Sequence, residues 1–318
     1  HRRGDLVAIG QLQAVDQAQD LVKIPACARG IDDRGANFLV RIDHIDSPDR
    51  DLGVGIWVDH IVQCRDAAVR IGNDRKLDAG VLRFFDVGDP SFVIFQTVDG
   101  DHQGLCAAFR ELARETGAWI LGGSIAVRAG DGRVANRSLV FDPSGVVAGR
   151  YDKIHMFDVD LPDGETYRES DTYQPGTETC VVRSPWGGIG MTVCYDIRFP
   201  GLYRMLAQAG ADFIAVPSAF TRQTGRAHWS VLLRARAIET GAYVFAPAQC
   251  GDHGGGRRTY GHTMIVDPWG TVLAEAGEDV GVTFADIDTS KVADARNAIP
   301  SLRQDAPYTP PPVARAAE

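Results

Sequence analysis

The stretch GGIGMTVCYDIRFPGLYRMLAQAG, residues 187–210, sets the fold class of this chain. Its first part is a short apolar run, typical of a buried strand, and Cys194 stands at the end of that run. Pro200 suits the first turn of a helix, and Gly210 ends it. The apolar stripe of that helix is predicted to consist of Leu202, Met205, Leu206 and Ala209. A strand that leads into a helix in this way is typical of α/β domains.

The same alternation of strands and helices continues on both sides of this stretch. Upstream, the pattern predicts a helix over 104–117, a buried strand over 118–127, and two strands joined by a Pro-Ser-Gly turn within 136–153. Downstream, it predicts a strand over 212–220, a helix over 228–241, a strand over 242–250, a hairpin over 261–276 and a strand over 282–288. Mixed strands with helices packed outside them indicate a layered α/β domain.

Length and composition exclude several classes of protein. The chain has 318 residues, 44% of them hydrophobic and 24% charged, which is a globular composition. Its formal net charge of -9 argues against a surface for nucleic acid or for an anionic membrane. No apolar run approaches the roughly 18 residues that span a bilayer, and the start HRRGDLVAIG has no apolar signal core. We therefore expect a cytoplasmic protein with no nucleic-acid or membrane partner.

Residues 1–103 form a compositionally atypical segment. The first 100 residues contain 16 Asp and no Glu, although Glu is a common residue in average proteins. Strands over 38–46 and 91–98 and a helix over 58–72 are conceivable, but no order joins them. Two interpretations account for this: a misread stretch of coding sequence joined to a genuine domain, or an unusual natural extension. We predict poor order here, a domain over 104–303 and a C-terminal tail over 304–318.

Cys194 is a candidate nucleophile because of its place in the chain. The six cysteines have no CxxC pair and no zinc-finger spacing, so free thiols and no metal site are expected. Functional groups of open α/β sheets gather at the carboxyl ends of strands. The backbone N–H groups at a strand-to-helix junction favour both a thiolate and the oxyanion formed by its attack on a carbonyl. Taken alone, a cysteine at such a position is more often structural.

Several motifs in a fixed order carry a resemblance to a known family. GRYDKIHMFDVD contains Lys153 after a strand, and YRESDTYQPG contains Glu169 in a loop. With CYDIRFP, PSAFTRQTGRAHW, RARAIET, AQCG, YGHTMIVDPWG and IPSLR, the chain resembles the nitrilase superfamily of carbon-nitrogen hydrolases over about residues 104–303. The resemblance implies an α-β-β-α sandwich, usually paired into a homodimer, and cysteine acyl transfer with no metal or organic cofactor.

The resemblance also implies roles for the matching residues. Cys194 would attack an amide carbonyl, form a thioester and release ammonia. Lys153 and the backbone N–H of Tyr195 would stabilise the tetrahedral oxyanion, and Glu169 would orient the lysine and the substrate. These roles are chemically sound, because a lysine beside a thiol favours the thiolate and neutralises the later oxyanion.

The general base of the family is missing from its expected place. In the family it is a glutamate at the end of an early strand, but the first Glu of this chain is Glu111, on the predicted helix over 104–117. Aspartate is one methylene shorter, and a base misplaced by about 1 Å costs on the order of a hundredfold in rate. The first strand and helix of the family are not evident either. We expect a catalytically impaired chain; the alternative is a non-catalytic, dimeric interaction scaffold.

The substrate class follows from resemblance alone. The downstream motifs look most like the branch that contains deaminated glutathione amidase, and next most like omega-amidases, so a small carboxylate-bearing amide is expected. Arg198, Arg222 and Arg226 are candidate partners for that carboxylate. Alternatively, Arg198 makes a structural salt bridge and the other two arginines are surface charges. His228 and His262 are interpreted as structural, because neither has the spacing of a metal site.

Overall fold

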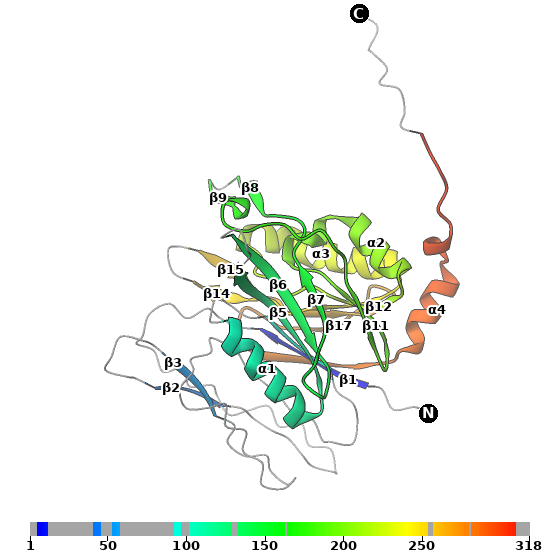
Figure 1. The fold of residues 1–318 in the computed structure, drawn as a ribbon. Coiled ribbons are helices and arrows are strands. Elements are labelled where there is room, and N and C mark those ends of the chain that lie inside the picture. Colours follow the sequence, from blue (N-terminus) through cyan, green and yellow to red (C-terminus); the bar gives the residue numbers. More distant parts are fainter. Residues whose placement is uncertain are drawn as a thin grey trace, which may run out of the picture.

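The computed structural model describes residues 5–11, 41–45, 53–57, 92–96, 102–128, 133–162, 164–253, 257–279 and 281–309. Two six-stranded sheets lie at the centre (Figure 1). The first has the order β18-β1-β4-β5-β6-β7. Its strands are β1 (Asp5–Gln11), β4 (Phe92–Gln96), β5 (Trp119–Arg128), β6 (Val134–Phe141), β7 (Val147–Asp152) and β18 (Gly281–Ile287). β1, β4 and β5 run parallel, and the remaining neighbours are antiparallel.

The second sheet carries the segment around Cys194 and has the order β10-β11-β12-β13-β16-β17. Its strands are β10 (Val181–Ser184), β11 (Gly187–Met191), β12 (Ala211–Ala215), β13 (Tyr243–Ala246), β16 (Met264–Val266) and β17 (Val272–Glu275). β11, β12 and β13 are parallel. Their carboxyl ends therefore meet at one edge of the sheet, where the loops that follow them can build a site.

Helices cover the outer faces of both sheets. In Figure 1, α1 (His102–Thr116) lies on one side, and α2 (Pro200–Gln208) and α3 (Arg222–Thr240) lie on the other. Phe109 and Leu112 of α1 belong to one buried cluster with Phe141 of the first sheet. Trp229 and Leu233 of α3 belong to another with strands of the second sheet. A third cluster fills the space between the sheets. This arrangement confirms the predicted α-β-β-α sandwich.

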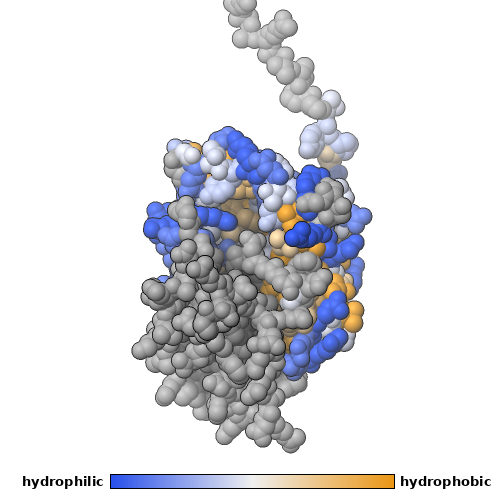
Figure 2. Space-filling view, turned by 60° about the vertical axis from the view of Figure 1, so that its left-hand side comes forward, coloured by the Kyte–Doolittle hydropathy of each residue, from blue (hydrophilic) through white to orange (hydrophobic). Residues whose placement is uncertain are grey.

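Shorter elements complete the described part of the chain. They are the pairs β2 (Arg41–Ile45) with β3 (Gly53–Trp57), β8 (Asp158–Asp160) with β9 (Thr166–Arg168) and β14 (Cys250–Asp252) with β15 (Arg258–Tyr260), the helix α4 (Ser290–Ala298), and the 3-10 turns η1 (Glu169–Asp171), η2 (Cys194–Arg198) and η3 (Ser301–Arg303). None of the described helices is both long and apolar enough to cross a bilayer. The described surface in Figure 2 is mostly hydrophilic, with apolar residues in a smaller orange area.

Most predicted elements are present, with two differences around the second sheet. The helix expected over 228–241 begins at Arg222, because the Thr221 side chain accepts a hydrogen bond from the Thr224 N–H and caps it. The predicted stripe of α2 is wrong at Met205, which is 55% exposed, and at Ala209, which is exposed and follows the end of the helix. Tyr203 is buried instead, so the apolar face is turned by part of a helical turn.

The atypical N-terminal segment contributes two strands to the first sheet. β1 lies between β18 and β4, and β4 pairs with β5 in a register that joins Phe92 to Trp119. The absence of the family's first strand and helix stays a prediction, because the pairing of β1 and β4 does not identify them as those elements. The helix considered over 58–72 lies outside the described residues, as do residues 310–318 of the predicted tail.

Candidate active site

A pocket of about 370 Å³ opens where the loops after several strands of the two sheets come together. It collects Lys153 from the end of β7, Glu169 from η1, and Cys194 with Tyr195 from η2. The residues after β12 form another wall. The pocket also includes Ser124, Ala126, Asn136, Phe157, Tyr167, Arg168, Thr172, Tyr173, Val193, Arg198, Pro217, Ser218, Ala219, Phe220, Thr221, Thr224, Gln249 and Arg257. Segments far apart in sequence thus build one concave site.

Cys194 occupies a sharp turn between strand and helix. Its φ is +49°, a left-handed conformation that non-glycine residues seldom adopt and that often marks functional sites. The Cys194 N–H donates to the Pro217 carbonyl at 2.9 Å, so this amide is already used. Within the described part of the chain, the next amide, that of Tyr195, has no hydrogen-bond partner. It is therefore the N–H that stays available beside the thiol.

The surroundings of the Cys194 thiol act on its pKa in opposite directions. Burial raises the pKa of Cys194 above its ordinary value, and this effect dominates. The Lys153 ammonium and the Ala219 N–H lower that pKa, while the Glu169 carboxylate raises it. The resting group is consequently a neutral thiol. A base is needed to generate the nucleophilic thiolate.

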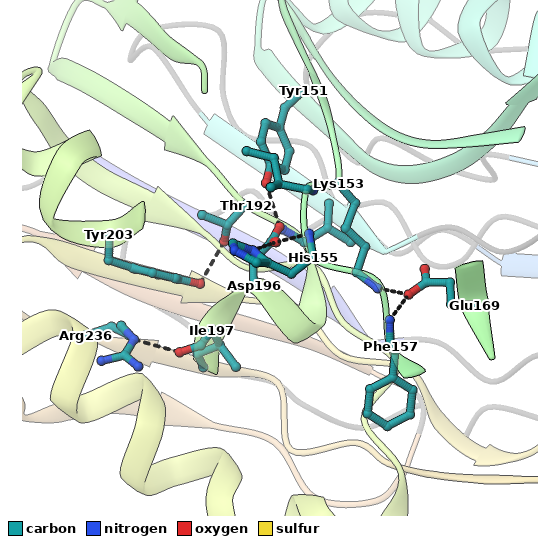
Figure 3. A network of polar contacts seen from close by, with 12 residues as sticks. Tyr151, Lys153, His155, Phe157, Glu169, Thr192, Asp196, Ile197, Tyr203 and Arg236 are labelled. Atoms are coloured by element: carbon teal, nitrogen blue, oxygen red, sulfur yellow. Dashed lines mark hydrogen bonds and ion pairs between the residues drawn. The ribbon is translucent and has the colours of Figure 1, made fainter. Parts of the chain in front are cut away.

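Lys153 and Glu169 form an ion pair inside the pocket, which Figure 3 shows in close-up. Lys153 is only 2% exposed, and its ammonium contacts Glu169 Oε2. The same oxygen accepts the Phe157 N–H at 2.6 Å, and Glu169 Oε1 accepts the Asn136 amide at 3.3 Å. The Lys153 backbone is held as well, by its N–H to the Asn136 carbonyl and its carbonyl to the Gly176 N–H, both at 2.8 Å. These bonds leave the ammonium little freedom to turn away.

The three arginines named from the sequence have different places. Arg198 lines the pocket, with its guanidinium 3.3 Å from His228 Nδ1 and 5.5 Å from the Phe220 ring centre. Among the described residues, Arg198 makes no ion pair with a carboxylate. The structural salt bridge considered for it is therefore not observed there.

Arg222 and Arg226 do not line the pocket. Arg222 pairs at the surface with Glu278 at 2.6 Å, and Arg226 is exposed. Both lie on the first turns of α3, whose buried face is formed by other residues. The prediction that Arg222 and Arg226 line the site is therefore not supported, because neither residue is on the part of α3 that borders the pocket. His262 pairs with Glu275 at 2.9 Å, outside the pocket lining.

Arg257 is a pocket residue that sequence analysis did not single out. It lies next to the short hairpin of β14 and β15, and it is close enough to Cys194 for its charge to lower the pKa of the thiol. No carboxylate partner for Arg257 occurs among the described residues. Its segment has no clear periodicity, and therefore no signal in the sequence marked it.

Glu169 is the one carboxylate among the described residues that line the pocket. It already accepts hydrogen bonds from three groups, including the Lys153 ammonium. The structure describes the side chains of none of the 16 early aspartates, so the missing base stays a prediction. A second carboxylate, Asp196, is fully buried behind the pocket and was not predicted. Its position two residues after the candidate nucleophile, in CYDIRFP, is the signal that could have found it.

Comparisons with known proteins show which family this chain is similar to. A sequence model of the family described as carbon-nitrogen hydrolase matches residues 97–297. Deaminated glutathione amidase from Yersinia enterocolitica is 49% identical over 199 residues, covering 62% of this chain and 70% of that protein. The protein of the same name from Mus musculus is 41% identical over 222 residues, covering 68% of each.

Solved structures show the same similarity. The NitFhit protein of C. elegans superposes with a TM-score of 0.61 at 38% identity, over 67% of this chain and 56% of that one. A cysteine-to-alanine mutant of the amidase from Nesterenkonia sp. AN1, in complex with butyramide, gives 0.51 at 26% identity, over 62% of this chain and 72% of that one. The chain thus spans between 56% and 72% of the length of the relatives described here.

Proposed function

Because this chain belongs to the carbon-nitrogen hydrolase family, we propose that it hydrolyses the amide bond of a small carboxylate-bearing substrate through Cys194. The amidase names of the relatives support amide hydrolysis in general. The proposal adds the residues that carry the reaction and the kind of substrate. We propose that residues 104–303 form the hydrolase domain, with β1 and β4 completing its first sheet, and that it pairs into a homodimer.

In the proposed reaction the thiolate of Cys194 attacks the amide carbonyl carbon. The carbonyl π electrons move onto oxygen, and Lys153 with the Tyr195 N–H stabilises this oxyanion. When the tetrahedral intermediate collapses, the C–N bond breaks, and the leaving nitrogen takes up a proton and departs as ammonia. Water then attacks the resulting thioester, which releases the carboxylic acid and returns the thiol.

One observation supports this assignment most strongly. A buried lysine, paired with Glu169, lies in the same pocket as a cysteine with a left-handed backbone and beside a free amide N–H. A lysine beside a thiol favours the thiolate and can stabilise the oxyanion that forms when the thiolate attacks a carbonyl. A scaffold that only presents a surface gains nothing from this arrangement.

Removal of the proton from the Cys194 thiol limits the rate of the reaction. Burial keeps the thiol neutral at rest, and the Glu169 carboxylate is already engaged by Lys153 and by the Phe157 N–H. We therefore expect hydrolysis to be slow in this chain unless a base reaches the pocket. Slow turnover would still differ from the behaviour of a scaffold, because the Lys153 ammonium lowers the pKa of the Cys194 thiol and a scaffold has no use for that effect.

We assign binding of the substrate carboxylate to two arginines that line the pocket. Arg198 and Arg257 both line it, and neither has an acidic partner among the described residues. An arginine that lines a pocket without a carboxylate partner can donate two parallel hydrogen bonds to the carboxylate of a substrate. This supports amides that carry a carboxylate over neutral amides.

The test combines reactivity with turnover. Iodoacetamide should modify Cys194 faster than Cys180, a partly buried thiol outside the pocket whose pKa burial also raises. Ammonia release from a dicarboxylic acid monoamide should depend on Cys194, be lost in Cys194→Ser and persist in Cys180→Ser. If Cys194 reacts no faster than Cys180 and no ammonia appears, the scaffold alternative is correct.

A further inference from the structure

We propose that Asp196 is a positioning residue that holds Lys153 at its working place relative to Cys194, by tying the end of β7 to the turn that carries the thiol. This inference rests on the proposed function, because it takes Lys153 and Cys194 as the reacting pair. It adds a residue that touches neither substrate nor thiol. Asp196 is fully buried, and the hydrogen bonds of its carboxylate support this role.

The carboxylate of Asp196 is saturated with donors. Its Oδ2 accepts the Tyr151 hydroxyl at 2.7 Å and the Val193 N–H at 2.9 Å. Its Oδ1 accepts the His155 N–H at 3.1 Å, and His155 Nδ1 lies 2.7 Å away. A carboxylate offers about four lone-pair sites, and four donors fill them. Figure 3 shows Asp196 between the Tyr151 and His155 side chains.

The directions of these bonds are set by their partners. The Tyr151 hydroxyl oxygen accepts the Ile154 N–H at 3.3 Å, so its own hydrogen points toward Asp196. Two of the other donors are backbone amides, which cannot reverse. The His155 ring is held in place by stacking on Phe199, with 3.5 Å between ring centres and 7° between planes. Only an acceptor-only group fits at position 196.

The bonds of Asp196 connect the two segments that must meet. Tyr151 and His155 lie two residues before and two residues after Lys153, and both contact Asp196. Asp196 itself follows Cys194 by two residues, and its bond to the Val193 N–H spans the left-handed turn. The carboxylate therefore couples the backbone around the ammonium to the backbone around the thiol.

A second contact secures the same turn from the helical side. Arg236 of α3 is buried and donates its Nε–H to the Ile197 carbonyl at 2.7 Å. Its side chain also pairs with Glu239 at 2.8 Å. Because Arg236 supports η2 independently, loss of Asp196 should displace the lysine segment relative to the thiol and leave the turn itself in place.

The test uses Asp196→Asn, which keeps the shape but turns an N–H2 donor toward existing donors. Two effects then predict opposite results. Loss of a nearby negative charge alone would lower the pKa of the Cys194 thiol and speed its alkylation at neutral pH. Displacement of Lys153 would raise the pKa and slow alkylation. We expect slowing by about tenfold, with the rate profile displaced toward alkaline pH.

The matched control is Asp212→Asn. Asp212 is a partly buried carboxylate of β12 that pairs with Arg296 at 2.8 Å and does not line the pocket. Its variant should lose stability without any change in the alkylation profile. Tyr151→Phe removes one donor from Asp196 without changing any charge, and we expect a smaller shift toward alkaline pH, by about two- to threefold in rate.

The outcomes separate this inference from the proposed function. If Cys194 of the unmodified chain reacts no faster than Cys180 and no ammonia is released, the proposed function fails. If Cys194 is reactive but folded Asp196→Asn reacts equally fast or faster, the positioning role is overturned and the proposed function stands. If Asp196→Asn does not fold, Tyr151→Phe decides, and an unchanged profile overturns the inference.

Discussion

Replacing Arg198 by methionine should weaken binding of carboxylate ligands selectively. The substitution removes a cation that lines the pocket and keeps a side chain of similar reach over the Phe220 ring. A hydrogen bond to a charged group contributes about 1.5–3 kcal/mol. The guanidinium is partly exposed, so water screens the interaction and the lower end of that range applies. At about 1.4 kcal/mol per factor of ten, the expected loss of affinity is about tenfold.

The assay measures protection of Cys194 from iodoacetamide, which needs no turnover. Glutarate serves as the carboxylate ligand and butyramide as the neutral amide. In Arg198→Met the Kd of glutarate should rise about tenfold, while that of butyramide should change by less than about twofold. Arg222→Met is the control, because Arg222 pairs with Glu278 outside the pocket and should leave both values unchanged. Equal weakening of both ligands, or none for glutarate, would refute the assignment of Arg198.

Three further results are expected. Lys153→Met combined with Glu169→Gln removes the ammonium that lowers the pKa of Cys194, while burial still raises that pKa. Alkylation of Cys194 should therefore slow at neutral pH and recover only at higher pH. An unchanged pH profile of alkylation would contradict the electrostatic role of the pair. Formate should increase ammonia release in proportion to its concentration by acting as a small base in the pocket, and it should have no effect in Cys194→Ser. Leu233→Ala should lower the free energy of unfolding by about 2–5 kcal/mol, since Leu233 is fully buried, and chemical denaturation would measure the loss.

Most of the fold could be predicted because strands and helices alternate strongly after residue 104. The helix α2 shows the limit of that reasoning, because Met205 and Tyr203 both suit an apolar stripe and only tertiary packing decides which is buried. The early start of α3 could have been predicted from Thr221, whose side chain caps the helix.

The site was predictable only in part. Cys194, Lys153 and Glu169 stand after strands or in loops, and the structure brings them into one pocket. Whether an arginine lines the pocket depends on the face of the helix that carries it, and spacing alone could not decide that face for Arg222. The role of Asp196 comes from four donors on two segments, and no periodicity in the sequence reports such a bond pattern.

The position of β1 has a consequence for how the chain is made. β1 pairs with β18 from Asp5 with Ile287 to Gln11 with Gly281, so two strands far apart in the sequence lie side by side. A domain emerging from the ribosome cannot close this sheet until β18 has been synthesised. Contacts this distant in sequence fold slowly. Nascent chains that stall before residue 281 should therefore stay sensitive to protease and depend on chaperones until β18 has emerged.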